Sequence, residues 1–246
     1  MDDLSRSFGR RRVDPDERTR LIRSVFQRVA PRYDLMNDLM SLGIHRYWKR
    51  YTVREAELGR PQRVLDLAGG TGDLAWQLAR QPQRAVWVCD PSQAMMQVGR
   101  ARGAPDRITW VAGCGERLPF RDAAFDLVTI AFGIRNVTHL DQTLCEILRV
   151  LRPGGRLLCL EFSRPARWLA PFYELYSRLV IPRLGAWVSR NPDAYRYLID
   201  SIRAFPDQER LAERFRAAGF TEVDYHNLSF GIACLHAGTR PTPDGA

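Results

Sequence analysis

Short apolar runs alternate with longer mixed stretches through the middle of the chain. The apolar runs cover residues 63–68, 85–90, 108–113, 125–132 and 156–162. Each run is apolar at nearly every position, which is typical of strands buried on both faces of a parallel sheet. The stretches between them predict helices at 73–80, 92–102 and about 140–151, and a turn at 152–155. The alternation therefore indicates an α/β fold with helices on both faces of a parallel sheet.

The C-terminal part departs from this alternation. Residues 167–197 are rich in aromatic residues, prolines and arginines, and they do not fit a simple crossover helix. An amphipathic helix is predicted at 207–218, with Gly219 as its C-terminal glycine. Residues 220–240 predict two strands around a turn near Ser229–Gly231. Five βα units followed by a strand pair are the layout of a class I methyltransferase sheet.

The N-terminal part has a pattern of its own. Residues 1–16 are charged and turn-rich, and we expect them to be loose. Residues 17–30 predict a helix that stops before Pro31. The stretch VFQRVAPRYDLMNDLMSLGIHRYWKR, residues 25–50, places apolar side chains on one side and arginines and acids on the rest, with Gly43 as a break. Further helical turns are expected there.

These patterns divide the chain into two expected parts. With 246 residues the chain is long enough for one substantial core. We expect residues 1–50 to form a helical lid that also binds substrate. Residues 51–246 are expected to form the methyltransferase domain, with a helical insert at about 167–200.

Composition adds two constraints. The formal net charge is +9, and Lys49 is the only lysine, so the positive charge is nearly all arginine. A basic surface favours nucleic acid or an anionic membrane, although a G+C-rich genome also produces arginine. The five cysteines are scattered without a CxxC pair, which indicates thiols in a reducing compartment. No secretory segment, membrane span or metal-ligand spacing is found, so no metal is expected.

The first candidate site follows the first strand of the sheet. In VLDLAGGTGDL, residues 64–74, a strand runs through glycines into a helix, so that backbone can approach a ligand closely. Gly70, Gly72 and Ala75 also match a dinucleotide-binding pattern. Asp66, however, would repel a pyrophosphate, whereas S-adenosylmethionine offers an ammonium group and a sulfonium. The carboxylate therefore favours S-adenosylmethionine over NAD.

Further candidates stand at the ends of later strands. Asp90 lies about 20 residues past the glycine loop, where an acid accepts both ribose hydroxyls, although a helix N-cap is an equal reading by itself. The loop GCGERLPF, residues 113–120, suits an adenine ring. AFGIRNV, residues 131–137, ends the fourth strand. Arg135 stays protonated, so it can hold an oxyanion but cannot act as a base; a bracing salt bridge is the alternative.

Several motifs together resemble one family. RVAPRYDLMNDLMSLGIHRYWK, VLDLAGGTGDLA, FDLVTIAFGIRNV, LRVLRPGGRLLCLEFSRP and YRYLIDSIRAFPDQERLAERFRAAGF are similar to segments of the UbiE/MenG-type quinone C-methyltransferases. The glycine loop and LRPGG are general to class I methyltransferases, whereas RYDLMNDLMS, FGIRNV and LEFSRP are specific to this family. The resemblance runs from about Ser24 to the final strand.

The resemblance implies both a fold and a reaction. The implied fold is the Rossmann-like class I S-adenosylmethionine-dependent methyltransferase, with a mostly parallel seven-stranded sheet and an antiparallel terminal strand. The implied methyl donor is S-adenosylmethionine. The implied acceptor is a polyprenylated quinol, methylated on a ring carbon, in ubiquinone or menaquinone biosynthesis.

The resemblance also assigns cofactor residues. Thr71 and Asp90 match family positions, whereas Cys114 and Gly115 stand where the family usually has Asn or Asp followed by Ala. Ala131 stands where many members have Ser. Cys114 is a poor hydrogen-bond acceptor for an adenine amino group, so we expect adenine recognition to differ. The residues expected to bind S-adenosylmethionine are Asp66, Gly69, Thr71, Asp90, Cys114, Gly115 and Ala131.

A substrate pocket and a catalytic pair complete the expected site. An isoprenoid tail needs an apolar channel, which methionine is adaptable enough to line. The expected pocket residues are Tyr33, Met36, Met40 and His45, with ordinary core packing as the alternative. Its place at a strand end makes Arg135 the expected holder of the quinolate oxygen, with Asn136 orienting that oxygen or the ring. An ordered water or His45 is expected to accept the hydroxyl proton, with His139 a weaker candidate.

The acceptor also bears on partners. A nearly insoluble quinol implies contact with a membrane surface or with partner proteins of quinone biosynthesis. We expect a cytoplasmic protein that binds the inner face of the membrane peripherally, through aromatic residues and arginines; their burial or solvation is the alternative. The residues of this expected docking face are Trp168, Phe172, Tyr176, Arg178, Arg183 and Trp187. A homodimer is expected by analogy alone.

Three other functions are alternatives to quinol methylation. A nucleic-acid methyltransferase would need an N/D-P-P-Y/F motif, a catalytic cysteine pair or a separate basic module, and none is found, so no nucleic-acid partner is expected. A non-catalytic scaffold that binds S-adenosylmethionine or lipid is a second rival, and a different hydrophobic acceptor is a third. Between quinols, we expect 2-methoxy-6-polyprenyl-1,4-benzoquinol, with demethylmenaquinol as a second substrate.

Overall fold

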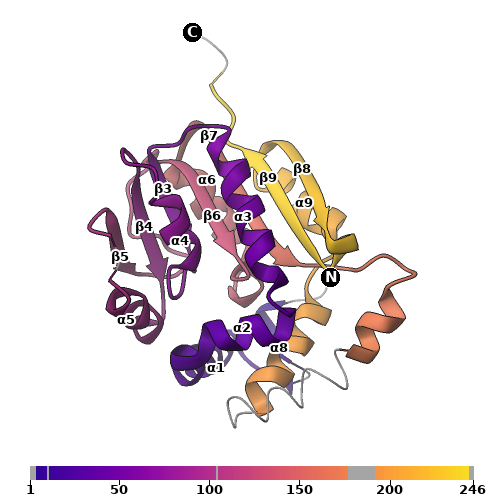
Figure 1. The fold of residues 1–246 in the computed structure, drawn as a ribbon. Coiled ribbons are helices and arrows are strands. Elements are labelled where there is room, and N and C mark those ends of the chain that lie inside the picture. Colours follow the sequence, from indigo (N-terminus) through magenta and orange to yellow (C-terminus); the bar gives the residue numbers. More distant parts are fainter. Residues whose placement is uncertain (1–3, 10, 104, 177–191, 244–246) are drawn as a thin grey trace.

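The computed structural model describes residues 4–9, 11–103, 105–176 and 192–243, without the side chains of 39–40 and 192–196. Its centre is a seven-stranded sheet with the order β5-β4-β3-β6-β7-β9-β8 (Figure 1). The strands are β3 (Arg63–Leu67), β4 (Ala85–Asp90), β5 (Ile108–Ala112), β6 (Phe125–Ala131), β7 (Leu151–Phe162), β8 (Thr221–Leu228) and β9 (Ala233–Thr239). The five apolar runs and the predicted strand pair thus all lie in one sheet.

The sheet is parallel from β5 to β7 and antiparallel beyond. β3 pairs in parallel with β4 and β6, and β5 and β7 continue the parallel pairing on either side. β9 runs antiparallel to both β7 and β8. The predicted class I arrangement with an antiparallel terminal strand is therefore confirmed. Because parallel strands end at one edge, the loops that follow β3 to β7 meet there.

Helices cover both faces of the sheet, and each face has its own apolar core (Figure 1). The helices are α3 (Ile44–Glu57) and α4 (Asp73–Leu78) on one face, and α6 (Leu140–Val150) and α9 (Gln208–Ala217) on the other. Leu74 and Leu78 are buried against the first face. Leu144, Ile147 and Phe215 are buried against the second. Burial on both faces explains why the central strands are apolar at nearly every position.

Helix starts follow the capping residues of the sequence. The side chains of Asp14, Ser92 and Asp207 accept hydrogen bonds from the first turns of α1 (Pro15–Val29), α5 (Gln93–Ala101) and α9. The predicted helices are therefore confirmed with ends shifted by one to two residues. Gly43, with φ +76°, separates α2 (Tyr33–Ser41) from α3 as predicted.

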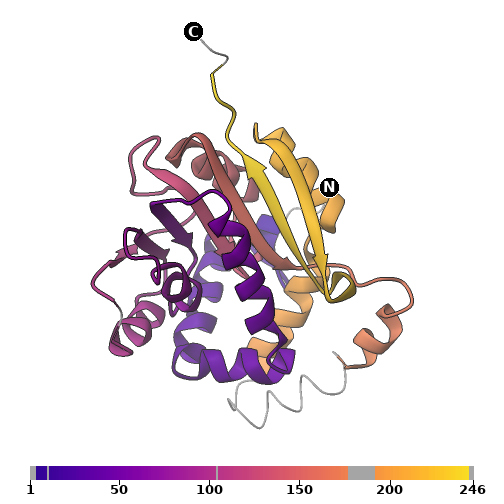
Figure 2. The same ribbon diagram turned by 45° about the horizontal axis from the view of Figure 1, so that its top comes forward.

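A third group of helices lies across the carboxyl edge of the parallel strands. α1, α2 and α8 (Pro192–Ala204) gather below the sheet in Figure 1, and the turned view of Figure 2 keeps them together. Arg18 of α1 fastens this group to the sheet. Its buried guanidinium donates hydrogen bonds to the carbonyls of Ser7, Arg135 and Val137. One side chain thus holds the N-terminal segment on the loop after β6.

Two local predictions were wrong. Residues 4–16, expected to be loose, include a 3-10 turn and a short ribbon of β1 (Ser7–Phe8) and β2 (Arg11–Arg12). The ribbon is ordered because Phe8 stacks on Tyr197 at 4.5 Å between ring centroids, beside the hydrogen bond from Arg18. The turn predicted at 152–155 is instead a bulge inside β7, where the register steps from Leu151 to Arg156.

The expected N-terminal lid and the expected methyltransferase domain share one helix. α3 runs from Ile44 to Glu57, so it crosses the expected boundary after residue 50. Of the expected insert, residues 170–176 are helical and α8 extends past residue 200. No described helix is both long enough and apolar enough to cross a membrane.

Candidate active site

Two cavities meet at the carboxyl edge of the sheet. The first, here named the glycine-loop cavity, is enclosed by the ends of β3, β4 and β6, the loop after β5, and α1. Of the predicted cofactor residues, Asp90, Cys114 and Gly115 line it. Gly70, next to the predicted Gly69, lines it as well, with φ +57°. The cavity therefore combines a carboxylate with close-lying backbone.

Asp90 is the charged centre of the glycine-loop cavity. Its two carboxylate oxygens accept hydrogen bonds from the backbone N–H groups of Gly70 and Ser92, at 2.9 and 2.7 Å. Burial raises the pKa of Asp90 to about 6, although both hydrogen bonds favour the ionised form. A carboxylate has about four acceptor positions, so Asp90 keeps capacity for hydroxyl groups of a ligand.

Four predicted cofactor residues stand behind the wall of this cavity instead of lining it. Asp66 is buried, accepts from Thr129 Oγ1 at 2.9 Å, and has an Oδ2 without a partner among the described residues. Burial raises its pKa to about 7. A Cβ on Gly69 would lie 2.7 Å from that Oδ2, so glycine is required there by packing. Thr71 donates to Asp34 Oδ1, and Ala131 packs with the core.

The second cavity, here named the helical cavity, lies between α2, α3, α8 and the helix at 170–176. It measures about 230 Å³, on a measure in which one water needs about 10–15 Å³. Its wall is mostly apolar and aromatic. The lining includes Asn37, Ser41, His45, Phe132, Arg135, Phe162, Pro165, Tyr173, Leu198 and Ile202. Phe132 lines both cavities, so the two sites share a wall.

Phe132 stands where β6 ends. Its φ of +57° is unusual for a residue with a side chain. Its ring packs against Phe162 at 4.7 Å and against Trp48 at 6.0 Å between centroids. The glycine after it is required because a Cβ on Gly133 would lie 2.6 Å from Ala68 Cβ. The strand end is therefore shaped to hold one ring between the cavities.

Arg135 reaches the helical cavity from a buried ion pair. Its Nη1 donates to Glu161 Oε1 at 2.6 Å and to the Phe132 carbonyl at 2.7 Å. Burial raises the pKa of Glu161, while Arg135 opposes that shift. The Nε–H of Arg135 has no partner among the described residues. Nε and Nη2 form the side-on edge by which arginine holds oxyanions, and the side-chain bonds to Phe132 and Glu161 are made by Nη1 instead.

The other predicted pocket residues are divided between several places. His45 lines the helical cavity, whereas Tyr33 and Asn136 line the glycine-loop cavity. Asn136 accepts a hydrogen bond from the Tyr197 hydroxyl at 2.9 Å. Met36 is buried in a cluster with residues of α1. The side chain of Met40 lies outside the described part of the chain, and exposed His139 lines neither cavity.

Sequence reasoning missed several residues of this site. Glu161 is an acid within the apolar run 156–162, and a buried acid needs a cationic partner, which was a usable signal. Phe132 gave no signal, because its backbone conformation has no sequence signature in a strand. Tyr173 and Tyr197 stand in a segment whose fold the pattern left undefined. The pairing of Asp38 with His45 was also missed.

The chain is similar to known proteins over nearly its whole length. A sequence model of the ubiE/COQ5 methyltransferase family matches residues 13–240. The chain belongs to the ubiE/COQ5 methyltransferase family. Within it, the chain is 58% identical over 245 residues to the ubiquinone/menaquinone biosynthesis C-methyltransferase UbiE of Rubrivivax gelatinosus, covering 98% of this chain and 97% of that one. It is 48% identical to the Bordetella avium protein of the same name, covering 95% and 93%.

Solved structures share the fold of this family member at lower identity. The [4+2]-cyclase SpnF matches with a TM-score of 0.61 and 21% identity, over 88% of this chain and 96% of that one. A Haemonchus contortus phosphoethanolamine N-methyltransferase in complex with S-adenosyl-L-methionine matches with a TM-score of 0.56 and 17% identity, over 74% and 49%. Because one neighbour is a cyclase, the fold alone does not decide the reaction.

Proposed function

We propose that this chain transfers a methyl group from S-adenosylmethionine to a ring carbon of a polyprenylated quinol in ubiquinone and menaquinone biosynthesis. The observation that carries the proposal is the shared wall at Phe132. On one side lies a cavity of glycines and a carboxylate, and on the other an aromatic cavity with a cationic edge. Relatives named as quinone C-methyltransferases match over nearly the full chain, which supports this acceptor class.

The residues of the glycine-loop cavity fit the cofactor. Asp90 has acceptor positions for ribose hydroxyls, and Gly115 lets the loop after β5 lie close against Thr143 of α6. We assign Asp66 and Gly69 to shaping the loop, and Thr71 to fastening it on α2. When bound, S-adenosylmethionine supplies an electrophilic methyl group on its sulfonium. The N-terminal helices, which we propose as a lid, keep water from that group.

The helical cavity is proposed to hold the quinol ring. Arg135 would hold the quinolate oxygen on its side-on edge, because that edge is preorganised by Glu161 and has no need to reorient. Asn136 is proposed to orient the ring from the other side of Phe132, with its own amide fixed by Tyr197. The protein thus contributes alignment and charge stabilisation to an in-line transfer.

The test is methyl transfer by the purified chain. With methyl-labelled S-adenosylmethionine, we expect label in the organic extract when 2-methoxy-6-polyprenyl-1,4-benzoquinol or demethylmenaquinol is supplied, and no label on RNA retained by a filter. The quinone profile of a deletion strain then shows which demethyl precursor accumulates. Cofactor binding without transfer to either quinol would favour the scaffold rival.

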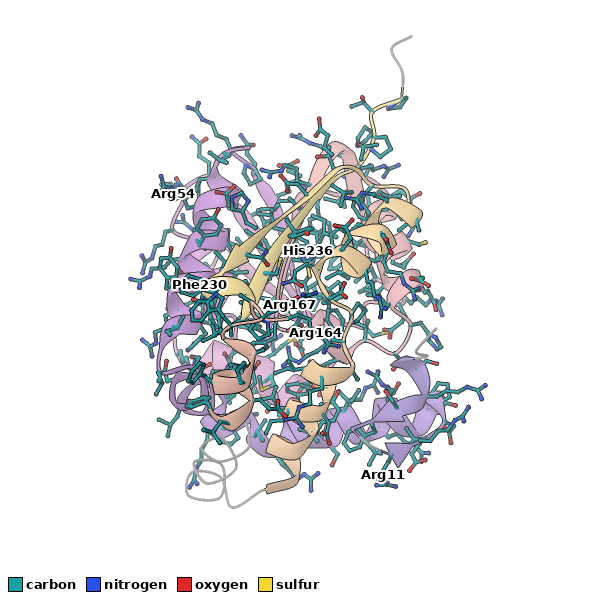
Figure 3. All side chains as sticks on the ribbon, turned by 90° about the vertical axis from the view of Figure 1, so that its right-hand side faces the viewer. Arg11, Arg54, Arg164, Arg167, Phe230 and His236 are labelled. Carbon is teal, nitrogen blue, oxygen red and sulfur yellow. The ribbon has the colours of Figure 1, made fainter. Side chains whose placement is uncertain are left out.

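Access from a membrane surface is a finer proposal. Trp168, Phe172, Leu175 and Phe230, here named the aromatic patch, are each more than half exposed. Trp168 packs on Phe230 at 5.1 Å, and Figure 3 places Arg164 and Arg167 beside Phe230. Arg164 also lines the helical cavity, so the patch adjoins its wall. Of the residues predicted for docking, Arg178, Arg183 and Trp187 lie outside the described part of the chain.

Vesicle binding tests this docking. We expect the chain to sediment with anionic vesicles at low salt and to be released at high salt, because each arginine near an anionic surface contributes roughly 1 kcal/mol. Phe230→Ala should weaken binding. Glu222→Ala, at an exposed position on β8 outside the aromatic patch, should leave binding unchanged. Equal absence of binding to anionic and neutral vesicles would leave partner proteins as the route for the quinol. A homodimer is a separate proposal, tested by sedimentation velocity.

A further inference from the structure

We propose that His45, oriented by Asp38, is the base that takes the proton from the acceptor's ring hydroxyl. The inference rests on the proposed function and adds the missing proton acceptor to it. Arg135 cannot accept a proton, so a quinol held on its edge needs a second group. Among the described residues of the helical cavity, His45 is the one imidazole.

The position of His45 depends on a hydrogen-bonded pair that joins two helices. His45 Nε2 lies 2.8 Å from Asp38 Oδ1, between the first turn of α3 and the end of α2. Arg46 holds the same carboxylate from outside, with Nε at 2.7 Å from Oδ1 and Nη2 at 2.5 Å from Oδ2. The imidazole is buried, while Arg46 is exposed. Asp38 is therefore fixed between a cation and the ring.

This pairing defines which ring nitrogen is basic. The hydrogen bonds from Arg46, followed by that from His45, lower the pKa of Asp38 to about 2, against the opposing effect of burial. An ionised carboxylate only accepts hydrogen bonds, so Nε2 must carry the proton. In neutral imidazole the lone pair is then on Nδ1. Nδ1 is buried and has no hydrogen-bond partner among the described residues, and His45 lines the helical cavity, so a ligand hydroxyl there would supply the donor that this nitrogen lacks.

Burial is the main reason that His45 is neutral near pH 7. Burial, followed by Lys49 one turn further along α3, lowers its pKa below the usual value, while Asp38 on α2 and Asp73 on α4 oppose the shift. Arg135 lines the same cavity from the loop after β6, where its charge is paired with Glu161. A neutral ring is the form that can accept a proton.

The proposed reaction begins with transfer of the hydroxyl proton to His45. The hydroxyl O–H bond breaks, an N–H bond forms on His45 Nδ1, and the electron pair stays on the oxygen beside Arg135. The adjacent ring carbon then forms its bond to the methyl carbon, and sulfur keeps the pair of the broken C–S bond. The ring proton leaves that carbon to solvent, the ring regains its aromaticity, and the imidazolium returns its proton to the oxygen. One proton is released in total.

Kinetics of three variants test the assignment. His45→Gln keeps an N–H group in reach of Asp38 but has no basic nitrogen, and we expect kcat to fall about 10²–10⁴-fold with KM within threefold. Asp38→Asn should lower kcat about 10–100-fold, as loss of an orienting partner does. His226→Ala, at an exposed position on β8, is the matched control and should be unchanged. S-adenosylhomocysteine affinity should stay within threefold in all, which shows that each variant is folded.

A second readout needs no turnover. Histidine ring NMR of the wild-type chain, assigned by comparison with His45→Gln, should show the Nε2–H tautomer and a pKa below that of a free histidine. The kcat/KM profile should fall tenfold per pH unit below that same pKa, and the fall should be absent in His45→Gln. An Nδ1–H tautomer, or a His45→Gln kcat within threefold of wild type, overturns the inference.

The outcomes separate this inference from the proposed function. If the wild-type chain methylates a quinol and His45→Gln does so equally well, the base assignment alone is wrong. If the wild-type chain binds S-adenosylhomocysteine but methylates neither quinol, the proposed function fails and the base assignment fails with it.

Discussion

The two cavities on either side of Phe132 are built in different ways. The glycine-loop cavity lies at the ends of adjacent parallel strands beside α1, and its central carboxylate is held by two backbone N–H groups. The helical cavity is formed by side chains from α2, α3, α8 and the helix at 170–176, which are far apart in sequence. Its charge is held by a buried ion pair between Arg135 and Glu161.

The difference separates what is general from what is particular. Sheet register places the strand ends of the first cavity, and a fold of this kind serves unrelated reactions, since the cyclase neighbour shares it. The second cavity depends on individual side chains, whose replacement changes its shape and charge directly. We therefore expect substitutions in the helical cavity to affect stability and turnover strongly. Those in the glycine-loop cavity should affect mainly cofactor affinity.

The largest effect is expected at the buried ion pair. Glu161→Ala leaves Arg135 buried without its carboxylate, which should lower the free energy of unfolding by about 3–5 kcal/mol. Asp122→Ala removes one of the two carboxylate partners of half-buried Arg149 from an exposed position and should change that free energy by less than about 1 kcal/mol. Urea denaturation of both variants measures the two values. Similar losses would mean that the helical cavity does not depend on its buried pair.

The next effect concerns turnover. Arg135→Lys keeps a cation beside Glu161 but removes the side-on edge, so we expect kcat to fall about 10²–10³-fold, the range for loss of a preorganised oxyanion donor. S-adenosylhomocysteine affinity should be unchanged, because Arg135 does not line the glycine-loop cavity. Initial-rate kinetics and calorimetry measure the two quantities. A kcat within threefold of wild type would exclude the oxyanion role.

A packing effect is expected in the glycine-loop cavity. A Cβ on Gly115 would lie 2.7 Å from Thr143 Cγ2, so Gly115→Ala should cost about 1–3 kcal/mol through overpacking. Cofactor affinity should fall, with kcat nearly preserved. Adding Thr143→Ser removes the methyl group and keeps the hydroxyl that donates to the His139 carbonyl, so it should restore affinity. Without that recovery, the contact is not the reason for glycine at 115.

The smallest effect is a pH dependence of cofactor binding. The pKa of Asp90 is about 6 because the carboxyl is buried, and ribose hydroxyls would stabilise its ionised form. Protonation therefore competes with binding, and S-adenosylhomocysteine affinity should fall about fivefold from pH 6 to pH 5. It should be flat above pH 7. Calorimetry of Asp90→Asn should show weaker binding that does not change between pH 6 and pH 5. If the affinity of this variant still changed with pH, we would assign the remaining dependence to Asp66.

The sequence predicted the sheet and the glycine-loop cavity well, for a physical reason. Strand order and the meeting of strand ends follow from continuous apolar runs, and Asp90 stands at a strand end in any such sheet. The exact wall did not follow. The cavity is lined by Gly70 and not by Gly69, and Asp66 lies behind the loop. Both outcomes depend on the direction of the peptides in the loop, where Ala68 and Gly70 adopt positive φ. That choice is made by packing.

The helical cavity was less accessible to sequence reasoning. Asp38 and His45 are seven residues apart, and they meet because Leu42 and Gly43 adopt positive φ and turn the chain between α2 and α3. Arg135 follows β6 and Glu161 lies near the end of β7. They meet because these two strands pair side by side, although α6 separates them in the sequence. The apolar stretch 25–50 indicated a pocket, yet Met36 is packed in a cluster of its own. Side-chain direction was the missing information.

Lys49 gives the chain an unusual chemical handle. It is the only lysine, it is buried, and its ammonium lies 2.7 Å from Asp73 at the start of α4. Apart from the amino terminus, an amine-selective acylating reagent therefore has one target, and this target is shielded while α3 rests on α4. The rate of acylation at residue 49 would report how often the two helices separate. Slower labelling in the presence of cofactor or quinol would show, without any engineered probe, that ligand binding holds these two helices together.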